Sequence, residues 1–140
     1  MSSDGDTRRL SPPDPLTALL GPEPAEDEWR ERRRGKVGAS LAPSICLPGV
    51  LPWLSPLSAY EAAMGSGPTP NLAMKAGAAL ERGVLEEVEA ASGGLHLWPN
   101  GRRWVQHPTL TWLGCTPDAW LSRVPYPTKV EELVGIVQVK

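Results

Sequence analysis

Two acidic residues, and an apolar strand that carries two polar side chains on one face, have the types and the order that metal-dependent hydrolysis needs. Glu81 lies inside a long helical pattern, and Asp118 closes the turn Thr116-Pro117-Asp118. Further along, Gln138 and Lys140 alternate with apolar residues in a predicted strand. An acid on a turn, followed by a strand with an oxygen ligand and a lysine two positions later, indicates metal-dependent hydrolysis of a phosphodiester.

The chemistry explains why these residue types belong together. Hydrolysis requires stabilisation of the charge that develops on the phosphorane-like oxygens and a lower pKa for the attacking water. The carboxylates of Glu81 and Asp118 are hard oxygen ligands that suit Mg²⁺ or Mn²⁺. Gln138 can add its amide oxygen, which holds a divalent cation less strongly than a carboxylate because it is neutral. Lys140 beside the metal would orient the water and offset negative charge.

Each of these residues also has a plainer interpretation. Glu81 interrupts an apolar stripe at helical spacing, and a carboxylate that faces a core is costly unless it is paired or bound to a metal. It can equally lie at the edge of the stripe and reach water. Asp118 has the type of an ordinary turn residue. Gln138 and Lys140 fit the solvated face of an edge strand equally well. The stripe consists of Met74, Gly77, Leu85 and Val88.

A basic cluster ends the first helical pattern of the chain. Acidic residues precede it on the same helix, so most of these arginines are expected to form a solvated helix end. One or two of them, followed by Gly35 and then Ser40, would instead form a phosphate site from a guanidinium fork and a hydroxyl. The basic cluster consists of Arg30, Arg32, Arg33, Arg34 and Lys36.

The elements that must position these residues are helices in the first part of the chain and strands in the second. Helices are predicted over residues 25–34, 56–64 and 71–91, with Asn71 as an N-cap and Gly35 as a helix end. The period then changes, and short segments split by turn residues predict strands of a mixed or antiparallel sheet. This order gives an α+β fold. The predicted strands cover 95–98, 103–106, 110–115, 119–122 and 133–139.

With 140 residues the chain forms one domain at most. Residues 1–25 contain five prolines among Ser, Asp and Gly, which predicts a disordered arm, with residues 16–20 as an alternative recognition segment. The folded domain is therefore expected over residues 26–140. The net charge of −2 argues mildly against a polyanion partner. The two cysteines lack metal or disulfide spacing, and neither a signal peptide nor a membrane-length apolar run occurs, so we expect a cytoplasmic location without a membrane partner.

From about Glu28 to Lys140 the chain resembles the YqaJ-type viral recombinase family, the lambda-exonuclease-like branch of the PD-(D/E)XK nucleases. The resemblance rests on several short motifs that occur in the order of the family. These motifs are Trp29 with Arg33-Arg34-Gly35-Lys36-Val37-Gly38-Ala39-Ser40, Leu51-Pro52-Trp53-Leu54-Ser55-Pro56, Asn71-Leu72-Ala73-Met74 leading into Gly77-Ala78-Ala79-Leu80-Glu81, His107-Pro108, Thr116-Pro117-Asp118 and Gly135-Ile136-Val137-Gln138-Val139-Lys140.

The resemblance implies a PD-(D/E)XK restriction-endonuclease-like core and a 5′-to-3′ exonuclease that acts on double-stranded DNA in phage recombination, in the cytoplasm of the host cell. It implies two Mg²⁺ ions, a single-strand annealing protein as partner and a homo-oligomer, since trimers occur in the family. Glu81, Asp118 and Gln138 match the metal ligands, and Lys140 matches the catalytic lysine. Arg33 and Ser40 match the residues that hold the DNA 5′-phosphate.

The chain departs from the family pattern in three ways. Gln138 stands where the family usually has Glu, and the spacer from Asp118 to Gln138 is long. The helix and strand that follow the lysine strand in the family are missing. We therefore expect a nuclease domain that is incomplete at its C-terminus. The alternative is a catalytically inactive, truncated DNA-binding or interaction remnant of the same fold. A related endonuclease is a third interpretation.

Overall fold

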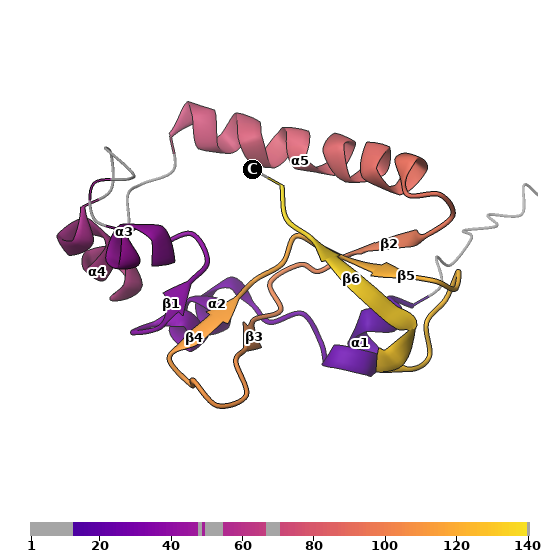
Figure 1. Cartoon of the computed structure of the whole chain (residues 1–140), viewed down its shortest axis with the longest axis horizontal. Coiled ribbons are helices and arrows are strands. Elements are labelled where there is room, and N and C mark those ends of the chain that lie inside the picture. The colour runs from indigo at the N-terminus through magenta and orange to yellow at the C-terminus, as the bar shows by residue number, and fades with distance from the viewer. Residues whose placement is uncertain (1–12, 48, 50–54, 67–70, 140) are drawn as a thin grey trace, which may run out of the picture.

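The computed structural model describes residues 13–47, 49, 55–66 and 71–139, and over these ranges the chain is α+β, as predicted (Figure 1). Lys140 and most of the motif at 51–56 lie outside the described residues. The α-helices are α1 (Pro15–Leu20), α2 (Glu26–Arg33), α3 (Ala42–Cys46), α4 (Pro56–Ala63) and α5 (Leu72–Ala91). The strands are β1 (Val37–Gly38), β2 (His96–Pro99), β3 (Val105–Gln106), β4 (Leu113–Cys115), β5 (Ala119–Ser122) and β6 (Leu133–Val137), with a 3₁₀ turn at Val130–Glu132.

The strands of the described residues form two small sheets. One sheet has the order β1-β4-β3, in which β1 runs parallel to β4 and β3 runs antiparallel to it. The other sheet has the order β2-β5-β6 and is antiparallel throughout. Residues 116–118 connect β4 of the first sheet to β5 of the second. The predicted Asp118 turn is therefore the junction between the two sheets.

Local capping sets the helix ends close to where the sequence predicts them. The Asn71 side chain accepts a hydrogen bond from the backbone N–H of Met74 at 3.0 Å and begins α5. Ser55 accepts one from the N–H of Ser58 at 3.1 Å and begins α4. After α2, Gly35 has φ of 68°, a left-handed conformation that favours glycine. These contacts satisfy backbone groups that a helix end leaves without intrahelical partners.

The prediction of a disordered arm over residues 1–25 is wrong for residues 13–25, while residues 1–12 lie outside the described residues. Asp14 caps α1 by accepting a hydrogen bond from the N–H of Leu16 at 3.0 Å, and Pro15 occupies the first helical position. Proline is compatible with this position because its missing N–H would have no partner there. Leu16 is fully buried, so its burial offsets part of the cost of ordering the segment.

The helix α5 extends along one side of the molecule and packs on β2 (Figure 1). Leu85 in its C-terminal half is 5% exposed, whereas Leu72 at its start is 83% exposed. The prediction that the whole apolar stripe faces a core is therefore wrong for Met74 and Gly77, which are exposed. Periodicity places apolar residues on one face, but only a neighbouring element can cover that face. None of the helices in the described ranges is long and apolar enough to cross a membrane.

A tryptophan fills the space beside the β1–β4 pair. A Cβ atom placed on Gly114 would lie 2.6 Å from Cε2 of Trp104 and 2.6 Å from the backbone oxygen of Val105. A Cβ on Gly38 would lie 3.9 Å from the same indole. The indole of Trp104 therefore needs a residue without a side chain at position 114.

We predict that Gly114→Ala destabilises the domain by about 1–3 kcal/mol, because the added methyl group displaces both the indole and a backbone oxygen. Chemical denaturation followed by tryptophan fluorescence measures this loss. Gly83→Ala is the matched control, since Gly83 lies within α5 with open space around it. The control should leave stability unchanged or raise it by up to about 1 kcal/mol. Equal effects of the two substitutions would contradict the packing argument.

Candidate functional site

A pocket of about 320 Å³ opens between α2, α5 and the turn that joins the two sheets. Five of the six site residues that the sequence predicts line this pocket, although they come from widely separated segments. Lys140, the sixth, lies outside the described residues. The lining residues are Trp29, Arg33, Gly38, Ala39, Ser40, Glu81, Gly101, Trp104, Cys115, Thr116, Asp118 and Gln138.

Backbone hydrogen bonds to both neighbouring strands hold Asp118. Its N–H donates to the carbonyl of Val137 at 3.0 Å, and its carbonyl accepts from the N–H of Asn100 at 2.9 Å. Its carboxylate oxygen Oδ2 accepts from the amide Nε2 of Gln138 and from the N–H of Val139, each at 2.6 Å. The Asp118 carboxylate thus has a fixed position at the pocket wall.

Glu81 enters the same pocket from α5. Burial raises the pKa of its carboxyl group above the usual value, and the negative charge of Asp118 raises that pKa further. Two carboxylates that repel each other across a pocket form an arrangement that a divalent cation would stabilise. Glu81 is half-buried, so its carboxylate lines a polar pocket and is not enclosed in an apolar core.

The oxygen atoms of the three predicted ligands suit a hard divalent cation, but only two of these ligands are carboxylates. Among the described residues, no group of three His, Cys, Asp or Glu side chains has the arrangement of a metal site. The third predicted ligand is the amide of Gln138, and its nitrogen faces Asp118 in this structure. For the amide oxygen to reach a cation beside Asp118, the amide would have to rotate.

Arg33 is the cation of this pocket. Its guanidinium lies 4.3 Å from the ring centre of Trp29 and 5.9 Å from that of Trp104, within range of a cation–π interaction. Burial lowers the pKa of Arg33. Within the described ranges it has no carboxylate partner, whereas its neighbours on α2 are paired, as expected for a solvated helix end. Those pairs are Arg30 with Glu26, Arg32 with Glu28, and Arg34 with Glu31.

Two tryptophans that are not among the predicted site residues complete the pocket. Trp29 precedes Arg33 by four residues on α2, a spacing that places the two side chains on one helix face. Its Nε1 donates to Oγ1 of Thr116 at 3.1 Å and ties α2 to the Asp118 turn. Trp104 has a buried Nε1 without a partner among the described residues. The helical spacing from Arg33 could identify Trp29 as a pocket residue. The position of Trp104 in the pocket depends on long-range strand pairing.

Comparisons with protein-family models, with curated proteins and with solved structures find no match for this chain. The resemblance to the YqaJ-type recombinases therefore remains a prediction from sequence motifs.

We predict that Asp118→Asn lowers the pKa of Glu81 toward its usual value, because the substitution removes the negative charge that raises it. The pKa should stay above the usual value, since burial is the larger cause. A pH titration of the side-chain carboxyl carbons by NMR reports Glu81 directly and needs no metal. Asp27→Asn, which removes an exposed carboxylate outside the pocket, is the control. Unchanged titration of Glu81 in Asp118→Asn would show that the two groups do not interact.

Proposed function

We propose that the chain is a metal-dependent deoxyribonuclease domain of the PD-(D/E)XK type, acting on the ends of double-stranded DNA. The observation that carries this proposal is the convergence of Glu81, Asp118, Gln138 and Arg33 on one pocket. These residues reach the pocket from four segments that are far apart in the sequence. Their convergence supports the prediction that rests on the order of the motifs along the sequence. Each of those motifs is weak on its own.

In this proposal the pocket has one side for a cation and one side for a phosphate. Glu81, Asp118 and the amide oxygen of Gln138 would hold Mg²⁺ or Mn²⁺. Such an ion supplies Lewis acidity and lowers the pKa of a bound water. Arg33 offers a planar fork of donors for phosphate oxygens, held in place by stacking. Ser40 lines the same pocket and offers a hydroxyl group.

Other features of the proposal follow from the family resemblance alone. They are the catalytic role of Lys140, a 5′-to-3′ polarity, an annealing protein as partner and assembly into a trimer. A comparison of linear and circular duplex DNA tests the exonuclease assignment, because an exonuclease needs an end. Equal digestion of both would favour an endonuclease instead.

We predict that Arg33→Lys weakens binding of duplex DNA about tenfold, which corresponds to about 1.4 kcal/mol. Lysine keeps the charge but loses the planar fork and the stacking on Trp29. Fluorescence anisotropy with a short duplex that carries phosphorothioate linkages, in the presence of Mg²⁺, measures the affinity without cleavage. Arg30→Lys is the control, because Arg30 lies on the same helix but pairs with Glu26 outside the pocket. An equal loss in both variants would argue against a specific phosphate contact.

The arrangement of Gln138 favours a second candidate, an inactive DNA-binding remnant. Its amide nitrogen donates to Asp118, and an amide in place of a carboxylate leaves the cation side with two negative charges. A remnant would keep the phosphate contact of Arg33 and lose the cation.

We predict that Gln138→Glu raises the affinity for Mn²⁺ at least about tenfold, because a carboxylate replaces a neutral ligand. Titration of free Mn²⁺ followed by electron paramagnetic resonance measures this change. Gln106→Glu adds the same charge beside Lys36, outside the pocket, and should leave the affinity unchanged. Mn²⁺ binding and DNA digestion by the natural chain support the enzyme. If only the Gln138→Glu variant binds Mn²⁺ and digests DNA, the result supports the remnant.

A further inference from the structure

We propose that residues 14–23 position the Asp118 turn, and that Arg103 and Asn100 are positioning residues that transmit this effect. The segment lies outside the part of the chain that carries the nuclease resemblance. The inference rests on the proposed function only where it treats Asp118 as a metal ligand.

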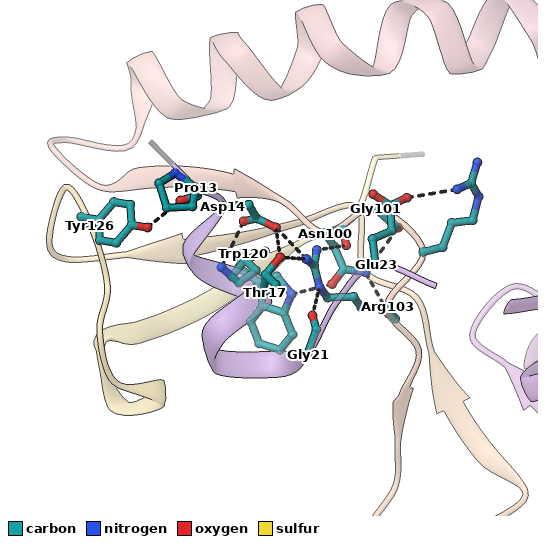
Figure 2. A network of polar contacts seen from close by, with 12 residues as sticks. Pro13, Asp14, Thr17, Gly21, Glu23, Asn100, Gly101, Arg103, Trp120 and Tyr126 are labelled. Carbon is teal, nitrogen blue, oxygen red and sulfur yellow. Dashed lines mark hydrogen bonds and ion pairs between the residues drawn. The ribbon is translucent and has the colours of Figure 1, made fainter. Parts of the chain in front are cut away.

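The first link is the guanidinium of Arg103, which is 6% exposed. Its Nη2 donates to Oδ2 of Asp14 at 2.6 Å and to Oγ1 of Thr17 at 3.0 Å, and its Nε donates to the carbonyl of Gly21 at 2.8 Å (Figure 2). These three acceptors all belong to α1 and its ends. The remaining bond, from Nη1 to the carbonyl of Asn100 at 2.9 Å, points to the interior.

The second link is Asn100, which is fully buried. Its Nδ2 donates to the carbonyl of Arg103 at 2.9 Å, so the two residues close the turn 100–103 from both ends. Its Oδ1 accepts from Nε1 of Trp120 on β5 at 2.7 Å. Figure 2 shows Asn100, Arg103 and Trp120 as neighbours within this network. The side chain therefore joins the turn to the strand that follows Asp118.

The third link is the backbone of Asn100, whose N–H donates to the carbonyl of Asp118 at 2.9 Å. This bond extends the β2–β5 pairing by one residue, because Pro99 pairs with Ala119. It is the last bond of that ladder before the chain turns at Gly101, and ladder ends open most easily. The closed turn 100–103 holds this bond in place.

The same segment also touches the pocket wall. A Cβ on Gly101 would lie 2.6 Å from Oε2 of Glu23, so the carboxylate of Glu23 packs directly on this glycine. Glu23 also pairs with Arg102 at 3.2 Å. Gly101 lines the pocket. Residues 14–23 thus contact the 100–103 turn from α1 at one end and from Glu23 at the other.

The consequence is a coupling between α1 and the pocket. Without acceptors from α1, a buried guanidinium would lose most of its hydrogen bonds, which is strongly unfavourable. Arg103 would then turn toward water and release the carbonyl of Asn100. The bond from Asn100 to Asp118 would open more often, and the carboxylate of Asp118 would lose its fixed position.

The experiment uses Asp14→Asn in the full chain, with Asp27→Asn as the matched control on exposed α2. Asparagine keeps the size of Asp14 but removes the charge that faces Arg103. We expect amide NMR resonances of Asn100 and Asp118 to shift and the affinity for Mn²⁺ to fall about tenfold, the scale of losses from residues that orient a metal ligand. The control should move neither readout. Thr17→Val, which removes one acceptor of Arg103, should have a smaller effect of the same kind.

A purely structural role for Arg103 would lower the melting temperature and leave the Asp118 amide and the Mn²⁺ affinity of the folded variant unchanged, and this result would overturn the inference. If Asp14→Asn fails to fold, the same readouts on Thr17→Val decide the question. If the natural chain binds no Mn²⁺, the proposed function fails, while the amide shifts still test the coupling to Asp118.

Discussion

The guanidinium of Arg103 sets the constraint on which much of the fold depends. A buried cation is tolerated only when hydrogen bonds surround it, and three of its acceptor groups lie 82 to 89 residues away in sequence. The beginning of the described chain is therefore fixed to the turn between β2 and β3. The buried Leu16 contributes apolar contact on the same helix. A proline-rich segment with few apolar residues becomes ordered because it satisfies a charge elsewhere.

From this anchor the chain continues into α2, which contributes Trp29 and Arg33 to the lining of the pocket. Residues 14–23 contact the turn at 100–103, where Gly101 lines the same pocket. The bond from Trp29 to Thr116 and the bond from Asn100 to Asp118 hold the same junction between the two sheets. The first third of the chain thus positions a loop that belongs to the last third.

Local features such as helix ends could mostly be predicted from the sequence, whereas contacts between distant segments mostly could not. Asn71 and Ser55 begin helices where predicted, and the change of period after residue 91 marks the start of the strands. Glu81, Asp118 and Gln138, which the order of the motifs assigns to one site, line one pocket, and their roles as metal ligands stay predictions. The sequence prediction fails for α1 because a high proline content indicates disorder, although Asp14-Pro15 has the form of a helix start. It does not find the role of Trp104, because the position of this side chain requires β1 to pair with β4, which no local pattern indicates.

The charges that line the pocket predict that its two proposed ligands bind cooperatively. Two carboxylates and one guanidinium are present among the lining residues. A phosphate alone would meet Arg33 favourably but would be repelled by Glu81 and Asp118. A divalent cation alone would relieve the repulsion between the carboxylates but would face the positive charge of Arg33. Each ligand removes the charge that opposes the other, so binding of a cation and of a phosphate should be cooperative. Gln138, as a neutral residue, weakens the cation side and reduces the repulsion of the phosphate at the same time.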